Sequence, residues 1–232
     1  MDTLTVLRVS LEGLATSFRY PFFAQGVHPT FELPPPATLY GLVSAAWGGW
    51  PPQENLRYGY TFTHRSRFED LEHLHFEGEV NPFVRHLLFE PRLTLYLAYP
   101  DLDSLAAAFR SPAYALCLGR SQDLMNCTEV KLVELQAAQE AYFEGTLLPP
   151  DLAPYVDGAT ITMTLARFVD QRRVPSWDQY ALLRGRARFP TDGLQAEGAP
   201  QQVWVDPEIR EWAQYPELSR GVCFHSFVGE TI

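Results

Sequence analysis

The sequence predicts an α+β fold, in which a first half of element order β–α–β–β–α–β precedes a smaller, β-rich C-terminal part. Segments of β-branched and alternating residues recur along the 232 residues, and two short segments have helical spacing. The chain's 19 prolines and 15 glycines are scattered, which favours short elements joined by turns. The element order of the first half is that of a ferredoxin-like or RRM-like unit.

The first half is predicted to open with a strand at residues 3–11 and a loop at 15–21, followed by a short helix. Three prolines keep the approach to this helix extended, and Pro36 can occupy its first turn, where a missing N–H costs nothing. Gly48-Gly49 supplies the left-handed residue that ends a helix. One apolar stripe is spaced for packing against a sheet: Leu39, Leu42, Val43 and Ala46.

After the helix, the sequence predicts a long hairpin over residues 58–97 whose tip projects from the domain. Strand-like residues at 58–67 and 84–97, the second run broken near Pro91, flank a polar, acidic segment at 68–81. The other predicted elements are a helix at 102–109 started by Asp101 or Asp103, strands at 114–118 and 128–135, a loop at 145–158, a strand at 159–169, an arginine-rich, turn-rich segment at 171–189, and a final strand at 222–228.

The charge balance argues against a generic nucleic-acid binder, because the formal net charge is -10 and such proteins usually carry a basic excess. The basic residues are nevertheless all arginines except Lys131. Arginine suits bidentate phosphate contacts and stacking on bases. RNA therefore stays open as a ligand, provided that the arginines gather on one face.

The cysteines and the N-terminus indicate the compartment. Cys117, Cys127 and Cys223 are odd in number and lack C-x-x-C spacing, so neither a disulfide framework nor a zinc site is predicted. The N-terminus lacks the basic and apolar regions of a signal peptide, and the longest apolar stretch is too short for a membrane span. We expect a cytoplasmic protein with no membrane association.

An arginine-rich window is the first candidate site. Six arginines lie between Arg167 and Arg188 against two acids, and Trp177, Tyr180 and Phe189 interleave with them. This combination suits single-stranded RNA, whose phosphates are gripped and whose bases are stacked. The alternative interpretation is a solvated face laced with surface ion pairs.

A second candidate is the turn Gly119-Arg120-Ser121, which offers backbone N–H groups, a guanidinium and a hydroxyl to a phosphate. It matches neither G-x-G-x-x-G nor a P-loop, so the alternative is an ordinary turn. His73-Leu-His75 places two imidazoles on one strand face, with His64 and His86 as possible neighbours, but no carboxylate or cysteine spacing supports a metal site. We predict no metal and no cofactor.

Residues 3–135 contain several further segments in a defined order. After the first strand come the loop Ala15-Thr-Ser-Phe-Arg-Tyr-Pro21, the segment Pro34-Pro-Pro-Ala-Thr-Leu-Tyr-Gly-Leu42, the stretch Asn81-Pro-Phe-Val-Arg-His-Leu-Leu-Phe-Glu-Pro-Arg-Leu-Thr-Leu-Tyr-Leu97, and the turn Leu118-Gly-Arg-Ser-Gln122. Together these segments resemble the CRISPR-associated Cas-five family of the RAMP superfamily. In that family the turn usually reads Leu-Gly-Arg-Ser-Glu, so Gln122 replaces the acid here.

The resemblance implies an RRM-like palm over residues 1–135, an inserted β-hairpin thumb at 60–90, and a C-terminal β-rich extension at 136–232 packed on the palm. It implies a subunit of a type I CRISPR surveillance complex (Cascade). Such a subunit holds the 5′ handle of the crRNA and caps the Cas-seven backbone next to the large subunit (Cas-eight type), and it meets target DNA through the complex. The acidic net charge fits a surface that mostly meets protein.

The implied RNA contacts are carried over by position. They are Arg19 and Tyr20 in the first loop, Arg120 and Ser121 in the glycine turn, and Arg65, Arg67, Arg85 and His86 in the thumb and its base. The charge window, without a family motif, adds Arg167, Arg172 and Arg173.

Some members of the family cut pre-crRNA as metal-independent endonucleases. That reaction needs a base for the 2′-hydroxyl and a cation for the phosphate. The glycine turn has neither Lys nor His, so we favour RNA binding without catalysis. The alternative is a processing endonuclease with His28, His86 or Tyr40 as its base. A third interpretation, a scaffold that only contacts protein, requires scattered and ion-paired arginines.

Overall fold

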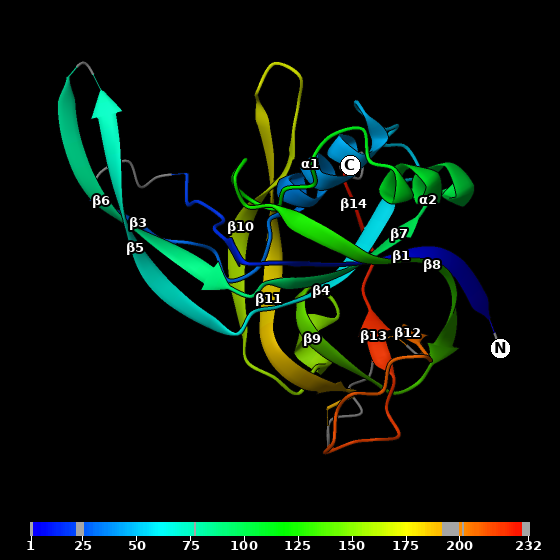
Figure 1. Ribbon diagram of the computed structural model, residues 1–232. Helices are drawn as coiled ribbons and strands as arrows, with labels where there is room; N and C mark the ends of the chain where they lie inside the picture. Colours follow the sequence, from blue (N-terminus) through cyan, green and yellow to red (C-terminus); the bar gives the residue numbers. More distant parts are fainter. Residues whose placement is uncertain (1, 22–25, 77, 192–199, 201, 229–232) are drawn as a thin grey trace.

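The computed structural model describes residues 2–21, 26–76, 78–191, 200 and 202–228. These residues form two α-helices, one 3₁₀ turn and a large set of strands (Figure 1). The helical elements are α1 (Pro36–Trp47), α2 (Leu102–Arg110) and η1 (Ala153–Tyr155). The strands are β1 (Thr3–Gly13), β2 (Ala15–Thr16), β3 (Val27–His28), β4 (Arg57–Thr63), β5 (Ser66–Phe76), β6 (Glu79–Phe89), β7 (Arg92–Ala98), β8 (Met125–Ala138), β9 (Ala141–Leu148), β10 (Thr160–Val169), β11 (Pro175–Phe189), β12 (Val203–Asp206), β13 (Arg220–Val222) and β14 (His225–Ser226). Within the described residues no helix is long and apolar enough to cross a bilayer.

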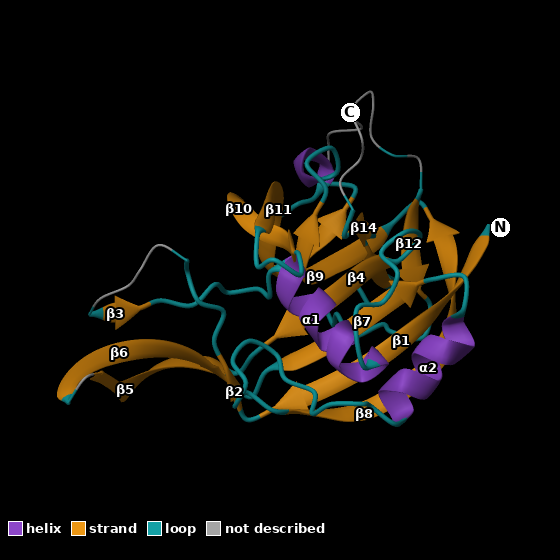
Figure 2. Cartoon of the chain, turned by 90° about the horizontal axis from the view of Figure 1, so that it is seen from above, coloured by secondary structure: helices purple, strands orange, loops and turns teal. Residues whose placement is uncertain are grey.

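Four strands and both helices form the ferredoxin-like unit that the sequence predicts. Strands β8, β1, β7 and β4 lie side by side in that order, and every pair is antiparallel. In the chain α1 lies between β1 and β4, and α2 lies between β7 and β8. Both helices pack on the same face of the sheet (Figure 2). This is the split β–α–β arrangement, and the predicted α+β fold class is confirmed.

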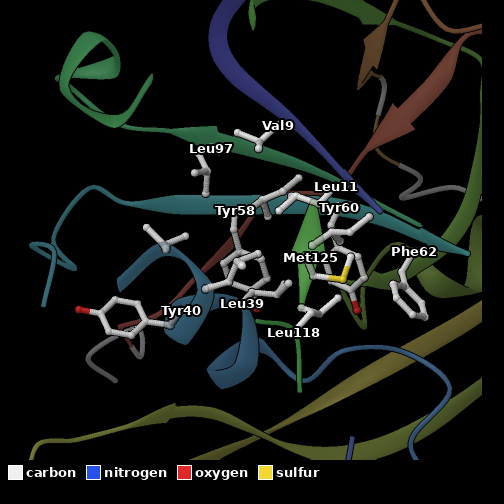
Figure 3. Close-up of a cluster of buried hydrophobic side chains, with 14 of the residues drawn as sticks. Val9, Leu11, Leu39, Tyr40, Tyr58, Tyr60, Phe62, Leu97, Leu118 and Met125 are labelled. Carbon is white, nitrogen blue, oxygen red and sulfur yellow. The ribbon is translucent and has the colours of Figure 1, made fainter. Parts of the chain in front are cut away.

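Helix α1 begins and ends where the sequence predicts. Pro36 is its first residue, and Gly48 adopts φ 86° while its N–H donates to the Ser44 carbonyl oxygen (3.0 Å). The four residues of the predicted stripe are each at most 2 % exposed, in a core shared with strand residues such as Val9 and Tyr58 (Figure 3). Helix α2 starts as predicted, because the Asp101 carboxylate accepts the Ser104 N–H (3.0 Å).

The C-terminal strands continue the same sheet, whose full order is β10-β11-β9-β13-β12-β8-β1-β7-β4-β14. The sheet curls until β9 meets β4, where Gly145 has φ 48° and a Cβ would lie 2.0 Å from the Phe62 carbonyl oxygen. Strand β10 reaches α1, and the Phe168 ring packs edge-on against Tyr40 (4.9 Å). One curled sheet therefore encloses α1, and the predicted division of the chain at residue 135 stays a prediction.

The face of the sheet away from the helices buries a charged network. Arg8 of β1 is 6 % exposed, and its Nη1 donates to the Asp206 carboxylate (2.7 Å), which is fully buried. The Tyr96 hydroxyl donates to the same carboxylate oxygen (2.9 Å). Glu129 and Glu208 accept two further bonds from Arg8, each 3.0 Å long. The network ties β12 to the centre of the ferredoxin-like unit.

The predicted hairpin exists, but its central segment is strand and not a polar connection. Strands β5 and β6 pair along their whole length and project from the body of the molecule, with β3 beside β6 (Figures 1 and 2). The described side chains of β5 are exposed except for the partly buried Glu72, so this strand carries polar residues without the alternation of a half-buried strand. The expectation for residues 68–81 is therefore wrong.

Three other expectations are also corrected. Residues 114–118 are not a buried strand: Tyr114 is 65 % exposed, and only an isolated bridge joins Cys117 to Leu124. The predicted loop at 145–158 begins too early, because residues 145–148 belong to β9. The segment predicted as turn-rich at 171–189 is mostly strand, because residues 175–189 form β11. A bulge between Leu183 and Arg186 interrupts the alternation of β11, and β9 is buried on both faces. The final strand is two short pieces, β13 and β14.

Replacing Asp206 with alanine removes the fully buried partner of Arg8. We expect the free energy of unfolding to fall by about 3–5 kcal/mol, because a buried charge loses its compensation. Urea denaturation measures the loss. Glu208→Ala is the matched control, since its carboxylate is exposed and its removal costs far less. Equal losses of unfolding free energy in the two variants would contradict the role of Asp206 as the main buried partner of Arg8.

Stability should also depend on His225, whose ring packs between Tyr58 and Tyr180 and whose Nε2 lies 3.0 Å from the Leu147 carbonyl oxygen. Burial lowers the pKa of His225 below its ordinary value, against the opposing effect of that carbonyl. The unfolded chain therefore takes up this proton at a higher pH than the folded chain, and stability is lost as the pH falls below about 6.5. We expect His225→Gln to flatten the decline in unfolding free energy measured between about pH 7.5 and 5.5. An unchanged slope would rule out this role for the ring.

Candidate nucleic-acid interface

The glycine turn packs directly against the first loop. Gly119 has φ 104°, and a Cβ there would lie 2.6 Å from the Ser17 carbonyl oxygen and 2.8 Å from Thr16 Oγ1. The Thr16 hydroxyl donates to the Leu118 carbonyl oxygen. Asp123 holds the two segments together, because its Oδ2 accepts the N–H of Ser17 (3.1 Å) and that of Arg120 (2.9 Å). Only glycine fits this close approach.

Arg120 is engaged by carboxylates of the protein itself. Its Nη2 donates to Asp123 Oδ1 (2.8 Å), and its Nη1 donates to Glu72 of β5. Arg85 of β6 donates to the other oxygen of Glu72 (2.9 Å). Burial lowers the pKa of Arg120, but Asp123 and Glu72 outweigh it and the pKa is raised. Arg85 and Arg120, both predicted as RNA contacts, thus share the Glu72 carboxylate. This shared carboxylate fixes the hairpin to the glycine turn.

A second cluster lies beside the first loop, at the base of the hairpin. The Tyr20 ring stacks on Phe31 (centroids 3.9 Å apart). Glu32 pairs with His64 (3.4 Å) and Arg67 (3.5 Å). The His64 hydrogen bond lowers the pKa of Glu32 against burial, and Arg184 of β11 lowers it further.

A cleft of about 410 Å³ lies between the first loop, α1, the glycine turn and strands β10 and β11. Arg19 is exposed at one wall and Trp177, 41 % exposed, stands on another. Gly119 and Gly41 are among the lining residues between these walls. A guanidinium and an indole on one hollow form a surface that can hold a phosphate and stack a base.

The remaining predicted contacts are dispersed. Arg65 pairs with Glu90 (3.2 Å), His86 with Glu69 (3.4 Å) and Arg167 with Asp178 (3.4 Å). Ser121 is exposed, and its carbonyl oxygen accepts the Cys117 thiol (3.1 Å). Arg172 and Arg173 are exposed at the β10–β11 turn. The structure thus brings Arg19 and the glycine turn to one cleft, whereas Arg65, His86 and Arg167 lie outside its lining.

The candidate bases do not share a site. Tyr40 is 3 % exposed and its hydroxyl donates to the Pro51 carbonyl oxygen (2.7 Å), and burial raises its pKa. His28 is 3 % exposed and packs on the Phe83 ring (4.3 Å). His28 aligns with Arg85 across β3 and β6, so His86, one residue further, points to the opposite face. Over the described part of the chain no group of three His, Cys, Asp or Glu side chains is placed to hold a metal ion.

Four residues of this region are not among the predicted RNA contacts: Phe31, Glu32, Trp177 and Arg184. Trp177 and Arg184 lie within the arginine-rich window, and their mixture of charge and aromatic residues was the available signal. The Tyr20–Phe31 stack follows from the pairing of Arg19 with Thr30 and of Phe31 with Phe18, which the local sequence does not indicate. The effect of Arg184 on the pKa of Glu32 depends on how β11 is placed by the curled sheet.

The fold, a ferredoxin-like unit with a projecting hairpin, was compared with known proteins. No family model matches the chain, and no curated protein matches it. Among solved structures, it is similar to a chain described as "CRISPR RNA-guided surveillance complex", with a TM-score of 0.54 and 15 % identity over 80 % of this chain and 91 % of that one. A CRISPR protein from Archaeoglobus fulgidus gives a TM-score of 0.45 and 12 % identity over 87 % and 99 % of the two chains. A chain described as a Cas protein gives 0.41 and 16 % over 85 % and 98 %. The first similarity shows a shared fold.

Gly119→Ala tests the packing of the glycine turn. We expect the free energy of unfolding to fall by at least about 1 kcal/mol, because the new methyl group meets the Ser17 backbone at a left-handed φ. Chemical denaturation provides the value. Gly185→Ala is the control, since a Cβ there meets nothing within 4 Å. If Gly119→Ala is as stable as the control variant, the turn does not depend on this contact.

Proposed function

We propose that this protein is a non-catalytic crRNA-binding subunit of a type I CRISPR Cascade complex. It holds the 5′ handle of the crRNA and caps the Cas-seven backbone next to a large subunit of the Cas-eight type. The proposal rests on two independent supports. One is the resemblance of residues 3–135 to the Cas-five family, and the other is a fold shared with a chain of an RNA-guided surveillance complex.

The observation that carries the proposal is the cleft. Arg19, Gly119 and Trp177 come from three distant parts of the sequence and line one hollow. Two of the three lie in segments that resemble the family, and the third comes from the arginine-rich window. Single-stranded RNA needs cationic groups for its phosphates and flat side chains for its bases, and this hollow offers both.

The projecting hairpin supports a role within a larger assembly. Leu71 is 62 % and Val80 is 51 % exposed on β5 and β6, and Val27 on the adjacent β3 is 45 % exposed. Aligned pairs show that Leu71 and Val27 both stand beside Val84 on one face of this small sheet. An apolar face on a projecting ribbon fits contact with another protein subunit.

We further propose that RNA is bound without being cut. Cleavage through a 2′-hydroxyl needs a base and a cation that face the same phosphate. Tyr40 is buried in the core, His28 is covered by Phe83, and His86 pairs with Glu69 on the other face of the β3–β6 pair. Arg85 and Arg120 are both held by Glu72.

The test uses the purified full chain and a labelled CRISPR repeat RNA in EDTA, followed for both binding and cleavage. We expect retention of the 5′ handle without cutting, and a weaker salt dependence in Arg19→Ala, because one phosphate contact is lost. Arg57→Ala is the matched control, since Arg57 is an exposed arginine at the end of β4 remote from the hairpin. Cleavage at a defined position would overturn the non-catalytic assignment. Equal losses in Arg19→Ala and Arg57→Ala would remove the cleft as the binding site.

A further inference from the structure

The cleft continues beyond the glycine turn. A second hollow of about 470 Å³ lies along α1, and it shares Ala37, Gly41 and Val169 with the cleft as lining residues. A third, of about 350 Å³, adjoins the second through Trp50 and Asp170. The three hollows thus adjoin one another from the first loop to the far end of the helix, and we call them together the α1 groove.

The far end of the α1 groove carries two exposed aromatic rings. Trp50, just after the helix, is 47 % exposed, and Tyr114 is 65 % exposed. The Tyr114 N–H donates to the Ala45 carbonyl oxygen (3.0 Å), which fixes its backbone beside the helix while the ring stays in solvent. Between the rings the floor is made of small residues, so a flat group can approach both.

The opposite wall is the β10–β11 turn, which is cationic. Arg173 lines the second hollow and Arg172 lines the third, and both are exposed. The acid of this turn, Asp170, accepts the backbone N–H of Arg172 (2.9 Å) and of Val174 (2.8 Å) through Oδ1. The Asp170 carboxylate thus bonds to the backbone of the turn. The side chains of Arg172 and Arg173 are exposed at the same turn.

We propose that the far end of the α1 groove is a second subsite for single-stranded RNA, separate from the cleft, in which bases stack on Trp50 and Tyr114 while Arg172 and Arg173 hold the phosphates. This inference rests on the proposed function and extends it to the path of the strand. Exposed aromatic rings opposite arginines are the chemistry of sequence-tolerant single-strand binding, because every base offers a π face. An apolar peptide would use the rings but gain little from two guanidinium groups at the rim.

The experiment measures the affinity of the full chain for two labelled oligouridines, of about 4 and about 12 nucleotides, both within the range of site sizes of single-strand binders. We expect Tyr114→Ala to weaken binding of the longer oligomer roughly 5- to 150-fold, the equivalent of one stacked base. Tyr114→Phe should retain the affinity, because the ring remains. Arg172→Ala should weaken binding of the longer oligomer and reduce its salt dependence, whereas Arg110→Ala on α2 should change neither.

The two oligomers separate the outcomes. We expect the shorter oligomer, which fills the cleft alone, to bind Tyr114→Ala as well as it binds the parent chain. If Arg19→Ala weakens the longer oligomer while Tyr114→Ala and Arg172→Ala do not, the second subsite is wrong and the proposed function stands. If the parent chain retains neither oligomer, both proposals fail together.

Discussion

The enclosure of α1 by one curled sheet is the constraint on which the rest of the structure depends. The helix buries its apolar stripe on the ferredoxin-like strands and meets β10 through Tyr40 and Phe168. The sheet can curl this tightly because Gly145 lets β9 approach the backbone of β4. What remains uncovered is the small-residue face of α1, between the first loop and the β10–β11 pair. The cleft and its extension along the helix are thus products of the same closure that completes the core.

The elements that the sequence predicts well are those whose limits are set locally. Pro36 and Gly48 bracket α1, and Asp101 caps α2, through contacts within a few residues along the chain. Strands β9 and β11 lack such signals, because burial on both faces hides the period of two in one and a bulge breaks it in the other. The hairpin is a different case, because nearly every described side chain of β5 is exposed and no alternation of burial marks it as a strand.

The same distinction between local and long-range determinants applies to the candidate site. The first loop and the glycine turn were predicted as site segments, and they do meet, because Gly119 needs the close approach that its residue type permits. The engagement of Arg120 with Glu72 could not be predicted, because the partners are 48 residues apart and on different elements. The arginine-rich window combines both interpretations: Arg186 and Arg188 pair with acids of the body, whereas Arg172 and Arg173 are exposed at the turn. The RNA contacts themselves stay predictions.

The buried pair of Arg8 and Asp206 has a consequence for folding during synthesis on the ribosome. Its partners are 198 residues apart, so the first strand leaves the ribosome long before its counter-ion exists. Before Asp206 is synthesised, the acidic partner available to Arg8 is Glu129 of β8, whose side chain is 41 % exposed. Long-range pairing of this kind slows folding, because the chain loses the entropy of closing a large loop before the contact can stabilise it. A chain truncated before β12 therefore lacks the fully buried counter-ion of the central strand β1.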